Sequence, residues 1–177
     1  NFEPLSAFNN EFIYTENIHA AYVMAGNKTG KLSYQGGLRA EYSDVTTELL
    51  LTNEVNNRRY LSLFPSAHFG YQINEKNNLS LGYSRRLSRP HFRNLLPFFS
   101  FSDNRNIRTG NPNLNPEFTH SVDLGYLKYF EKGSILPSIY YRHTTGEVER
   151  ITLIDSLGLT RSLPINLATE NSIGIEM

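Results

Sequence analysis

The sequence contains no cysteine, carries no net charge and has no long apolar run, and each absence excludes a class of protein or site. Without cysteine there is no disulfide, no thiolate metal site and no cysteine nucleophile. Because 17 basic residues balance 17 acidic ones, no overall field attracts nucleic acid, and any basic function must be local. No segment approaches the roughly 18 consecutive apolar residues of a transmembrane helix.

Solid aliphatic runs are also missing, although the buried parallel sheet of a soluble α/β enzyme would require them. The 177 residues instead contain 11 tyrosines and 11 phenylalanines, with no tryptophan and a mean hydropathy of −0.42. Apolar residues recur at every second position, and no helical period is visible. This composition predicts an all-β protein.

The clearest alternation covers residues 31–43. One parity reads L-Y-G-L-A-Y and the other reads K-S-Q-G-R-E-S, so apolar and polar side chains fall on opposite faces of a strand. The segment is longer than the strand of about 5–6 residues that is usual in globular proteins. It is therefore typical of a strand that crosses a membrane.

The same pattern recurs along the chain and predicts about seven strands. They cover residues 11–24, 31–43, 60–72, 78–86, 120–128, 134–145 and 167–177. In 134–145 the sequence IYY breaks the alternation and leaves the inward and outward faces undecided. Short polar turns at 26–30, 74–78 and 131–134 alternate with long connections at 44–59, 87–119 and 146–166. This order predicts an antiparallel up-and-down meander with all its long loops at one end.

Long two-faced strands predict a transmembrane antiparallel β-barrel, of which this chain is a partial one. In hydrocarbon every backbone group needs a partner, so only helices and closed barrels span a bilayer, and a barrel strand needs about 9–11 residues. The apolar face would meet acyl chains, and tyrosines would form the interfacial girdles. These tyrosines are Tyr14, Tyr22, Tyr34, Tyr42, Tyr71, Tyr83 and Tyr126.

The polar face would line a wet or plugged lumen. Arg39 and Glu41 are expected to pair with each other or to contact a plug, with direct contact to a transported solute as the alternative. Among the five histidines, His19 and His68 have lumenal parity, and no pair has metal-ligand spacing. The sequence predicts no catalytic residue, metal or cofactor, and therefore no enzyme.

Arginines gather where residues 78–86 end, which predicts the point where the strand leaves the hydrocarbon. Arg85 shares parity with Leu81 and would meet anionic headgroups, whereas Arg86 would face the lumen. Pro90 and Pro97 stop ladder pairing. The following loop would fold over the barrel mouth with its cationic and aromatic side chains. These are Arg89, Arg93, Arg105, Arg108, Phe92, Phe98, Phe99 and Phe101.

Two motifs in this region carry a family resemblance. The run YSRRLSRPHFRNLLPF at 83–98 and the run RTGNPNLNPEF at 108–118 resemble the β-barrel region of TonB-dependent receptors, and more narrowly the outer-membrane β-barrel family of Bacteroidetes. GLRAEYS at 37–43 and LFPSAHFGY at 63–71 are similar to that family as well. The prolines of GNPNLNPE predict a rigid connector back to the membrane, with a ligand-binding loop as the alternative.

The resemblance implies a much longer protein. Receptors of this kind have an N-terminal plug and a barrel of roughly 22 strands, and about eight strands are the minimum for closure. No plug and no TonB box are visible in residues 1–177, so the sequence is interpreted as a middle or late barrel segment.

The implied function is binding of an extracellular nutrient and its import across the outer membrane of a Gram-negative bacterium. The implied partners are outer-membrane lipid and lipopolysaccharide, the TonB energy-coupling complex through the missing plug, a surface lipoprotein and a small nutrient, but no nucleic acid. The candidate ligand-binding residues are Arg39, Glu41, His68, Arg86, Arg89, Arg93, Phe98 and Arg108. Two alternatives remain: a barrel with a structural or assembly role, and a soluble all-β binding domain.

Overall fold

A computed structural model describes residues 11–98, 100–101 and 105–177. Seven long strands dominate the fold, as the alternation predicts. They are β1 (Phe12–Thr29), β2 (Leu32–Leu49), β3 (Glu54–Asn74), β4 (Asn77–Ser88), β7 (Glu117–Phe130), β9 (Ser138–Ile154) and β10 (Thr160–Glu176). Among the described residues, three short strands and one helical turn accompany them: β5 (Ser100–Phe101), β6 (Asn106–Arg108), β8 (Gly133–Ile135) and α1 (Phe92–Leu95).

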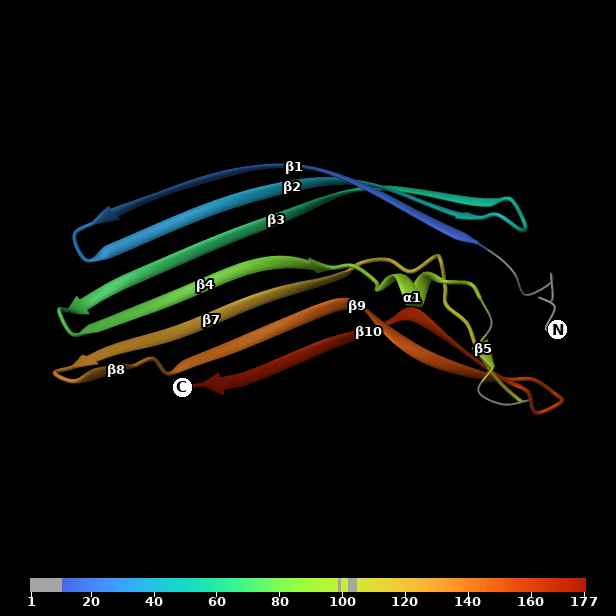
Figure 1. The fold of residues 1–177 in the computed structure, drawn as a ribbon. Helices are drawn as coiled ribbons and strands as arrows, with labels where there is room; N and C mark the ends of the chain where they lie inside the picture. The colour runs from blue at the N-terminus through green and yellow to red at the C-terminus, as the bar shows by residue number, and fades with distance from the viewer. Residues whose placement is uncertain (1–10, 99, 102–104) are drawn as a thin grey trace.

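The strands form one open, curved sheet (Figure 1). The long strands lie in the order β1-β2-β3-β4-β7-β9-β10, every neighbouring pair antiparallel. Short turns join them at one end, as predicted. Among the described residues, no helix combines the length and hydropathy needed to cross a bilayer.

Two of the three predicted long loops are wrong. Residues 44–59 continue β2 and β3 as a paired hairpin that turns only after Leu49, and residues 146–166 do the same for β9 and β10. Both extensions point to the end of the sheet away from the short turns (Figure 1). Since about 9–11 residues suffice to cross a bilayer, these hairpins rise beyond it. Only the connection between β4 and β7 remains a long loop.

The sheet splits between β3 and β4. Their pairing ends at Ser66 and Ser84, although β3 extends back to Glu54 and β4 forward to Ser88. From this point toward the long hairpins, at the right of Figure 1, β1, β2 and β3 diverge from β4, β7, β9 and β10. Arg85 lies at the split, where its Nη1 donates to the carbonyl of Leu63 at 2.7 Å and its guanidinium lies 4.3 Å from the Phe118 ring centre.

The prediction that the sheet has one apolar face and one polar face is confirmed. Leu32, Leu38, Leu81 and Leu124 are 42–43% exposed on the outer face instead of being gathered in a dry interior. Directly opposite residues of antiparallel strands share a face, so the pairing of Gln35 with His68 puts both on the inner face. In the segment whose parity was undecided, Tyr140 and Arg142 share the inner face with Asp123 and Ser121.

The predicted faces of β1 are reversed. Tyr14 lies opposite Thr47 and Tyr22 opposite Arg39, so both tyrosines share the inner face rather than an outer girdle. His19 lies opposite Tyr42 on the outer face, not in the lumen. Both parities of β1 contain apolar residues, so its register against β2 decides the orientation, and the sequence of β1 alone does not.

The membrane face generates the first prediction. Phe69 and His68 are exposed neighbours on β3 that point outward and inward, respectively. Phe69→Arg would put a guanidinium into lipid, which costs up to about 2–4 kcal/mol near the bilayer midplane. We expect it to lower the amount of heat-resistant, membrane-assembled protein on a gel-shift assay. The control His68→Arg should leave assembly close to wild type, and equal effects of both would contradict the assigned faces.

Candidate functional site

The described residues of the connection between β4 and β7, 89–98, 100–101 and 105–116, cross the inner face of the sheet from β4 to β10. β6, within this segment, pairs in parallel with Thr160–Ser162 of β10, and the Thr109 amide donates to the Ser162 carbonyl at 3.0 Å. The segment also folds on itself, since the Gly110 amide donates to the Leu96 carbonyl at 2.8 Å. We call these described residues between 89 and 116 the crossing segment.

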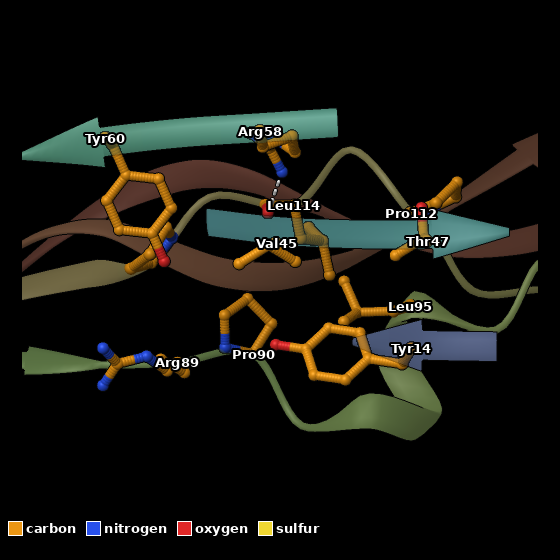
Figure 2. A pocket seen from close by; sticks show the side chains of 11 residues that line it. Tyr14, Val45, Thr47, Arg58, Tyr60, Arg89, Pro90, Leu95, Pro112 and Leu114 are labelled. Carbon is orange, nitrogen blue, oxygen red and sulfur yellow. Dashed lines mark hydrogen bonds between the residues drawn. The ribbon is translucent and has the colours of Figure 1, made fainter. Parts of the chain in front are cut away.

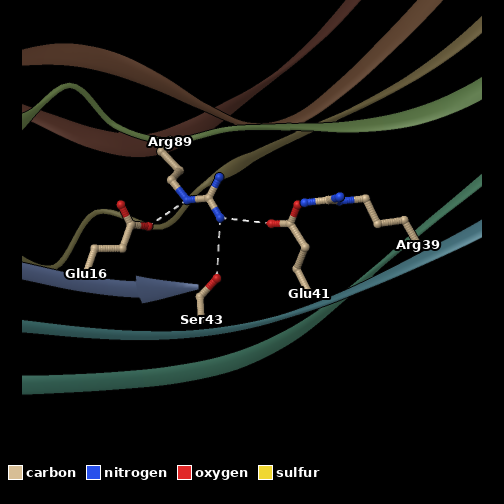
Figure 3. Close-up of polar contacts among 5 residues, drawn as sticks. All are labelled: Glu16, Arg39, Glu41, Ser43 and Arg89. Atoms are coloured by element: carbon tan, nitrogen blue, oxygen red, sulfur yellow. Dashed lines mark hydrogen bonds and ion pairs between the residues drawn. The ribbon is translucent and has the colours of Figure 1, made fainter. Parts of the chain in front are cut away.

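Arg89 fastens the start of this segment to β1 and β2 (Figure 3). Its Nε donates to Glu16 at 2.6 Å, and its Nη2 donates to Glu41 at 2.9 Å and to Ser43 Oγ at 3.4 Å. Glu41 also accepts from Arg39 Nε at 2.8 Å. Glu16 and Arg89 share this cluster with three β2 residues, and we call it the Arg89 clasp. It joins the two halves of the split sheet.

The charges of the clasp support one another. Burial alone would lower the pKa of Arg89, but the Glu41 and Glu16 carboxylates outweigh it and raise the pKa. Next to the clasp, burial and the Glu16 charge raise the pKa of Tyr14 to about 12, so its hydroxyl stays neutral. The clasp is therefore internally neutralised, which indicates a structural role for its charged groups.

A small apolar core lies beside the clasp (Figure 2). Val45 of β2, Leu95 of α1 and Leu114 are the buried hydrophobic side chains of the described residues. The cavity that they line with Tyr14 and Pro90 holds about 30 Å³. Since a single water occupies about 10–15 Å³ on this measure, the cavity is too small for a nutrient.

The GNPNLNPE motif ties both halves of the sheet together, as the rigid-connector prediction expects. Arg58 of β3 donates to the Leu114 carbonyl (Figure 2). It also donates to Asn115 Oδ1. From the other half, Asn166 Nδ2 donates to the Asn115 carbonyl at 2.9 Å. Asn111 Nδ2 donates to the Pro164 carbonyl at 3.0 Å. The motif asparagines thus bond to β10, while Arg58 holds the motif from β3.

A larger open pocket lies on the other side of the crossing segment. It has a volume of about 480 Å³, within the range of about 300–1,000 Å³ typical of ligand sites. The side chains around it are Phe92, Arg93, Leu96, Phe98, Arg108 and Arg150. We call it the arginine pocket. Three of the predicted site residues, Arg93, Phe98 and Arg108, meet here.

The remaining candidates do not join this pocket. Arg39, Glu41 and Arg89 form the clasp. His68 lies on β3 beside a separate open pocket of about 470 Å³, and Arg86 is exposed on the inner face opposite Thr119. Phe99 lies outside the described residues. Sequence reasoning missed Glu16, Arg58 and Arg150; Glu16 alone had a local signal, because it interrupts the apolar parity of β1.

Comparisons with known proteins agree with this fold. The model of the Outer membrane protein beta-barrel family matches residues 1–177. No curated protein matches the chain. Similar solved structures include the Serratia marcescens hemophore receptor HasR, at 13% identity and a TM-score of 0.71, covering 90% of this chain and 31% of HasR.

Two further structures are similar. The copper transporter OprC has 14% identity and a TM-score of 0.70 over 92% of this chain and 26% of its own. The FrpB iron transporter from Neisseria meningitidis has 15% identity and a TM-score of 0.65 over 96% of this chain and 24% of its own. The predicted barrel fold is thereby confirmed, and the chain spans less than a third of each of these structures.

The Arg89 clasp generates the second prediction. Arg89→Leu would leave the Glu16 and Glu41 carboxylates without their shared cation. Since a hydrogen bond to a charged group contributes about 1.5–3 kcal/mol, we expect the amides of Gly110 and Asn111 to exchange about 10- to 100-fold faster with deuterium. In the double variant Arg89→Leu, Glu16→Gln, one of the two unpaired carboxylates is neutralised, so part of the exchange protection of these amides should return. The control is Arg59→Leu, which removes only an exposed pair with Asp44; equal exchange in both variants would contradict the role of the clasp.

The close approach of Gly110 generates the third prediction. A Cβ at this position would overlap the Leu96 carbonyl oxygen and lie 2.6 Å from that of Asn94, so alanine cannot fit without moving backbone. We expect Gly110→Ala to loosen the crossing segment and speed tryptic cleavage after Arg93 and Arg108 on whole cells. At Gly36 a Cβ meets no atom within 4 Å, so Gly36→Ala is the matched control. Cleavage at the wild-type rate in Gly110→Ala would contradict the tight packing.

Proposed function

The chain belongs to the outer membrane protein beta-barrel family, and from this premise we propose that it forms part of the wall of a TonB-dependent receptor that imports an extracellular nutrient. The family assigns the protein to the outer membrane of a Gram-negative bacterium. A Bacteroidetes origin, coupling to TonB and a surface lipoprotein partner remain predictions from the sequence motifs.

The inner face of the wall carries the proposal. It presents polar and charged side chains such as His68, Arg86 and Asp123, which an apolar core would not tolerate without partners. A water-filled or plugged lumen accommodates them. The crossing segment lies over this face at the end with the long hairpins, where a solute arriving from outside would meet it first.

The open sheet supports the role of a wall segment. In lipid, unpaired backbone groups at a sheet edge are too costly, so a membrane sheet must close on itself. Among the described residues β1 pairs with β2 alone, and β10 continues to Glu176 beyond its short pairing with β6. We infer that further strands of the same protein complete the barrel next to β1 and β10.

The buried residues argue against the soluble alternative. A soluble domain of this size would bury a substantial core, whereas the buried hydrophobic side chains among the described residues are Val45, Leu95 and Leu114. Leu95 and Leu114 belong to the crossing segment and line one cavity with Val45 of β2, so this core lies between the crossing segment and the sheet. The apolar surface of the wall therefore points outward.

A growth comparison tests nutrient import. A strain that lacks this protein and a strain that lacks the TonB coupling protein would be grown on a panel of single nutrient sources at limiting concentration. We expect at least one nutrient on which both strains slow to the same extent, because the import step requires both proteins. Expression of the intact protein should restore growth of the first strain only.

The opposite outcome identifies a structural barrel. In that case the deletion strain would grow like wild type on every source and become sensitive to large antibiotics that an intact outer membrane excludes. This result would contradict the import function and favour the assembly role.

A further inference from the structure

Most arginines among the described residues have a partner within the protein, whereas the side chains of Arg86 on the inner face and of three further arginines form no hydrogen bond or ion pair with a described residue. Arg39, Arg58, Arg59 and Arg89 donate to carboxylates or carbonyls, and Arg85 and Arg142 lie over aromatic rings. In contrast, the side chains of Arg93, Arg108 and Arg150 form no hydrogen bond or ion pair with any described residue. These three are the arginines of the arginine pocket.

Strand pairing holds two of the three together. Arg108 of β6 lies beside Ser162 of β10, and Ser162 lies opposite Thr152 of β9. Arg150 is two residues from Thr152 and therefore points to the same face of β9. Arg93 joins them from α1, which the crossing segment brings to the same pocket. The convergence is thus built from three separate segments.

No carboxylate lines the pocket among the residues that the structure describes. Three like charges around one opening repel one another and attract an anion. Guanidinium groups bind phosphate and carboxylate through paired N–H donors, which gives such a site geometric selectivity. The charge of the pocket therefore fits an anionic ligand better than a neutral or cationic one.

The other walls of the pocket are apolar. Phe92 is 52% exposed and lies with Leu96 and Phe98 around the opening. Exposed phenylalanines offer ring faces and edges to an aromatic group. A ligand that combines an anionic group with a ring would use both kinds of wall.

We propose that the arginine pocket binds an anionic aromatic nutrient through a phosphate or carboxylate held by Arg93, Arg108 and Arg150, with its ring against Phe92 and Phe98. This inference rests on the proposed import function and names its substrate class. Phosphate groups could also come from lipopolysaccharide, and the test separates this source from a dissolved one.

Binding would be measured by calorimetry on the intact protein purified in a neutral detergent. The probes are phenyl phosphate, benzoate, inorganic phosphate and phenol, and separately lipopolysaccharide in detergent micelles. We expect phenyl phosphate to bind at least tenfold more tightly than inorganic phosphate or phenol, and more weakly as salt rises. The triple variant Arg93→Gln, Arg108→Gln, Arg150→Gln should bind phenyl phosphate at least 100-fold more weakly.

Arg59→Gln is the matched control, because it removes an exposed arginine of β3 outside the pocket. It should bind phenyl phosphate like wild type. To show that the fold of the triple variant is intact, trypsin should cleave it after lysine residues at the same rate as it cleaves the wild type. Binding of lipopolysaccharide alone, or equal binding of phenyl phosphate by the triple variant and wild type, would overturn the proposal.

The growth comparison separates the two claims. If the triple variant restores TonB-dependent growth as well as wild type does, the pocket is not the substrate site, although import stands. If phenyl phosphate binds through the three arginines but the deletion strain has no nutrient defect, the import function fails and the anion site stands.

Discussion

The half of this sheet that carries the long hairpins depends on how the break in its hydrogen-bond ladder is repaired. A sheet is held by the pairing of each strand with its neighbours, and here the pairing of β3 with β4 stops at Ser66 and Ser84. Above that level, side chains replace the backbone ladder. Arg85 donates to the Leu63 carbonyl, and Arg89 reaches Glu16 and Glu41 on the opposite half. The crossing segment fills the split and reconnects the two halves of the sheet.

Alternation in the sequence reveals strands only where one face meets lipid. It located all seven long strands, because residues such as Leu81 and Ser80 must differ when one meets acyl chains and the other water. It underestimated β2, β3, β9 and β10 because their outer ends have no lipid-facing side that must be apolar. In the sequence TTEL at the end of β2, Thr47 is buried beside Leu95 and Leu114, while Thr46 and Glu48 are partly exposed. Strand length beyond the membrane is set by pairing with the neighbour, and single-strand periodicity does not record pairing.

The same limit explains the successes and failures at the candidate site. Arg93, Phe98 and Arg108 could be selected because they lie close together in sequence within one loop. Arg150 could not, since only the register of β6, β10 and β9 brings it beside Arg108. The sequence predicts that Arg39 and Glu41 pair with each other or contact a plug or solute, and that Arg89 contacts a ligand; in the structure Glu41 accepts from both Arg39 and Arg89. The charge of an arginine does not show whether its side chain bonds to other residues of the protein or is left to bind a ligand.

The rigid-connector and ligand-loop interpretations of GNPNLNPE are compatible. Gly110 contributes to the arginine pocket, while Asn111 bonds to Pro164 and Leu114 is buried against the opposite half of the sheet. A loop that must hold Arg93 and Arg108 near Arg150 against their mutual repulsion needs fixed points on both sides. Arg58 and Arg89 supply these points on one half of the sheet, and Asn166 supplies one on the other. The paired arginines therefore provide the rigidity that keeps the unpaired ones together.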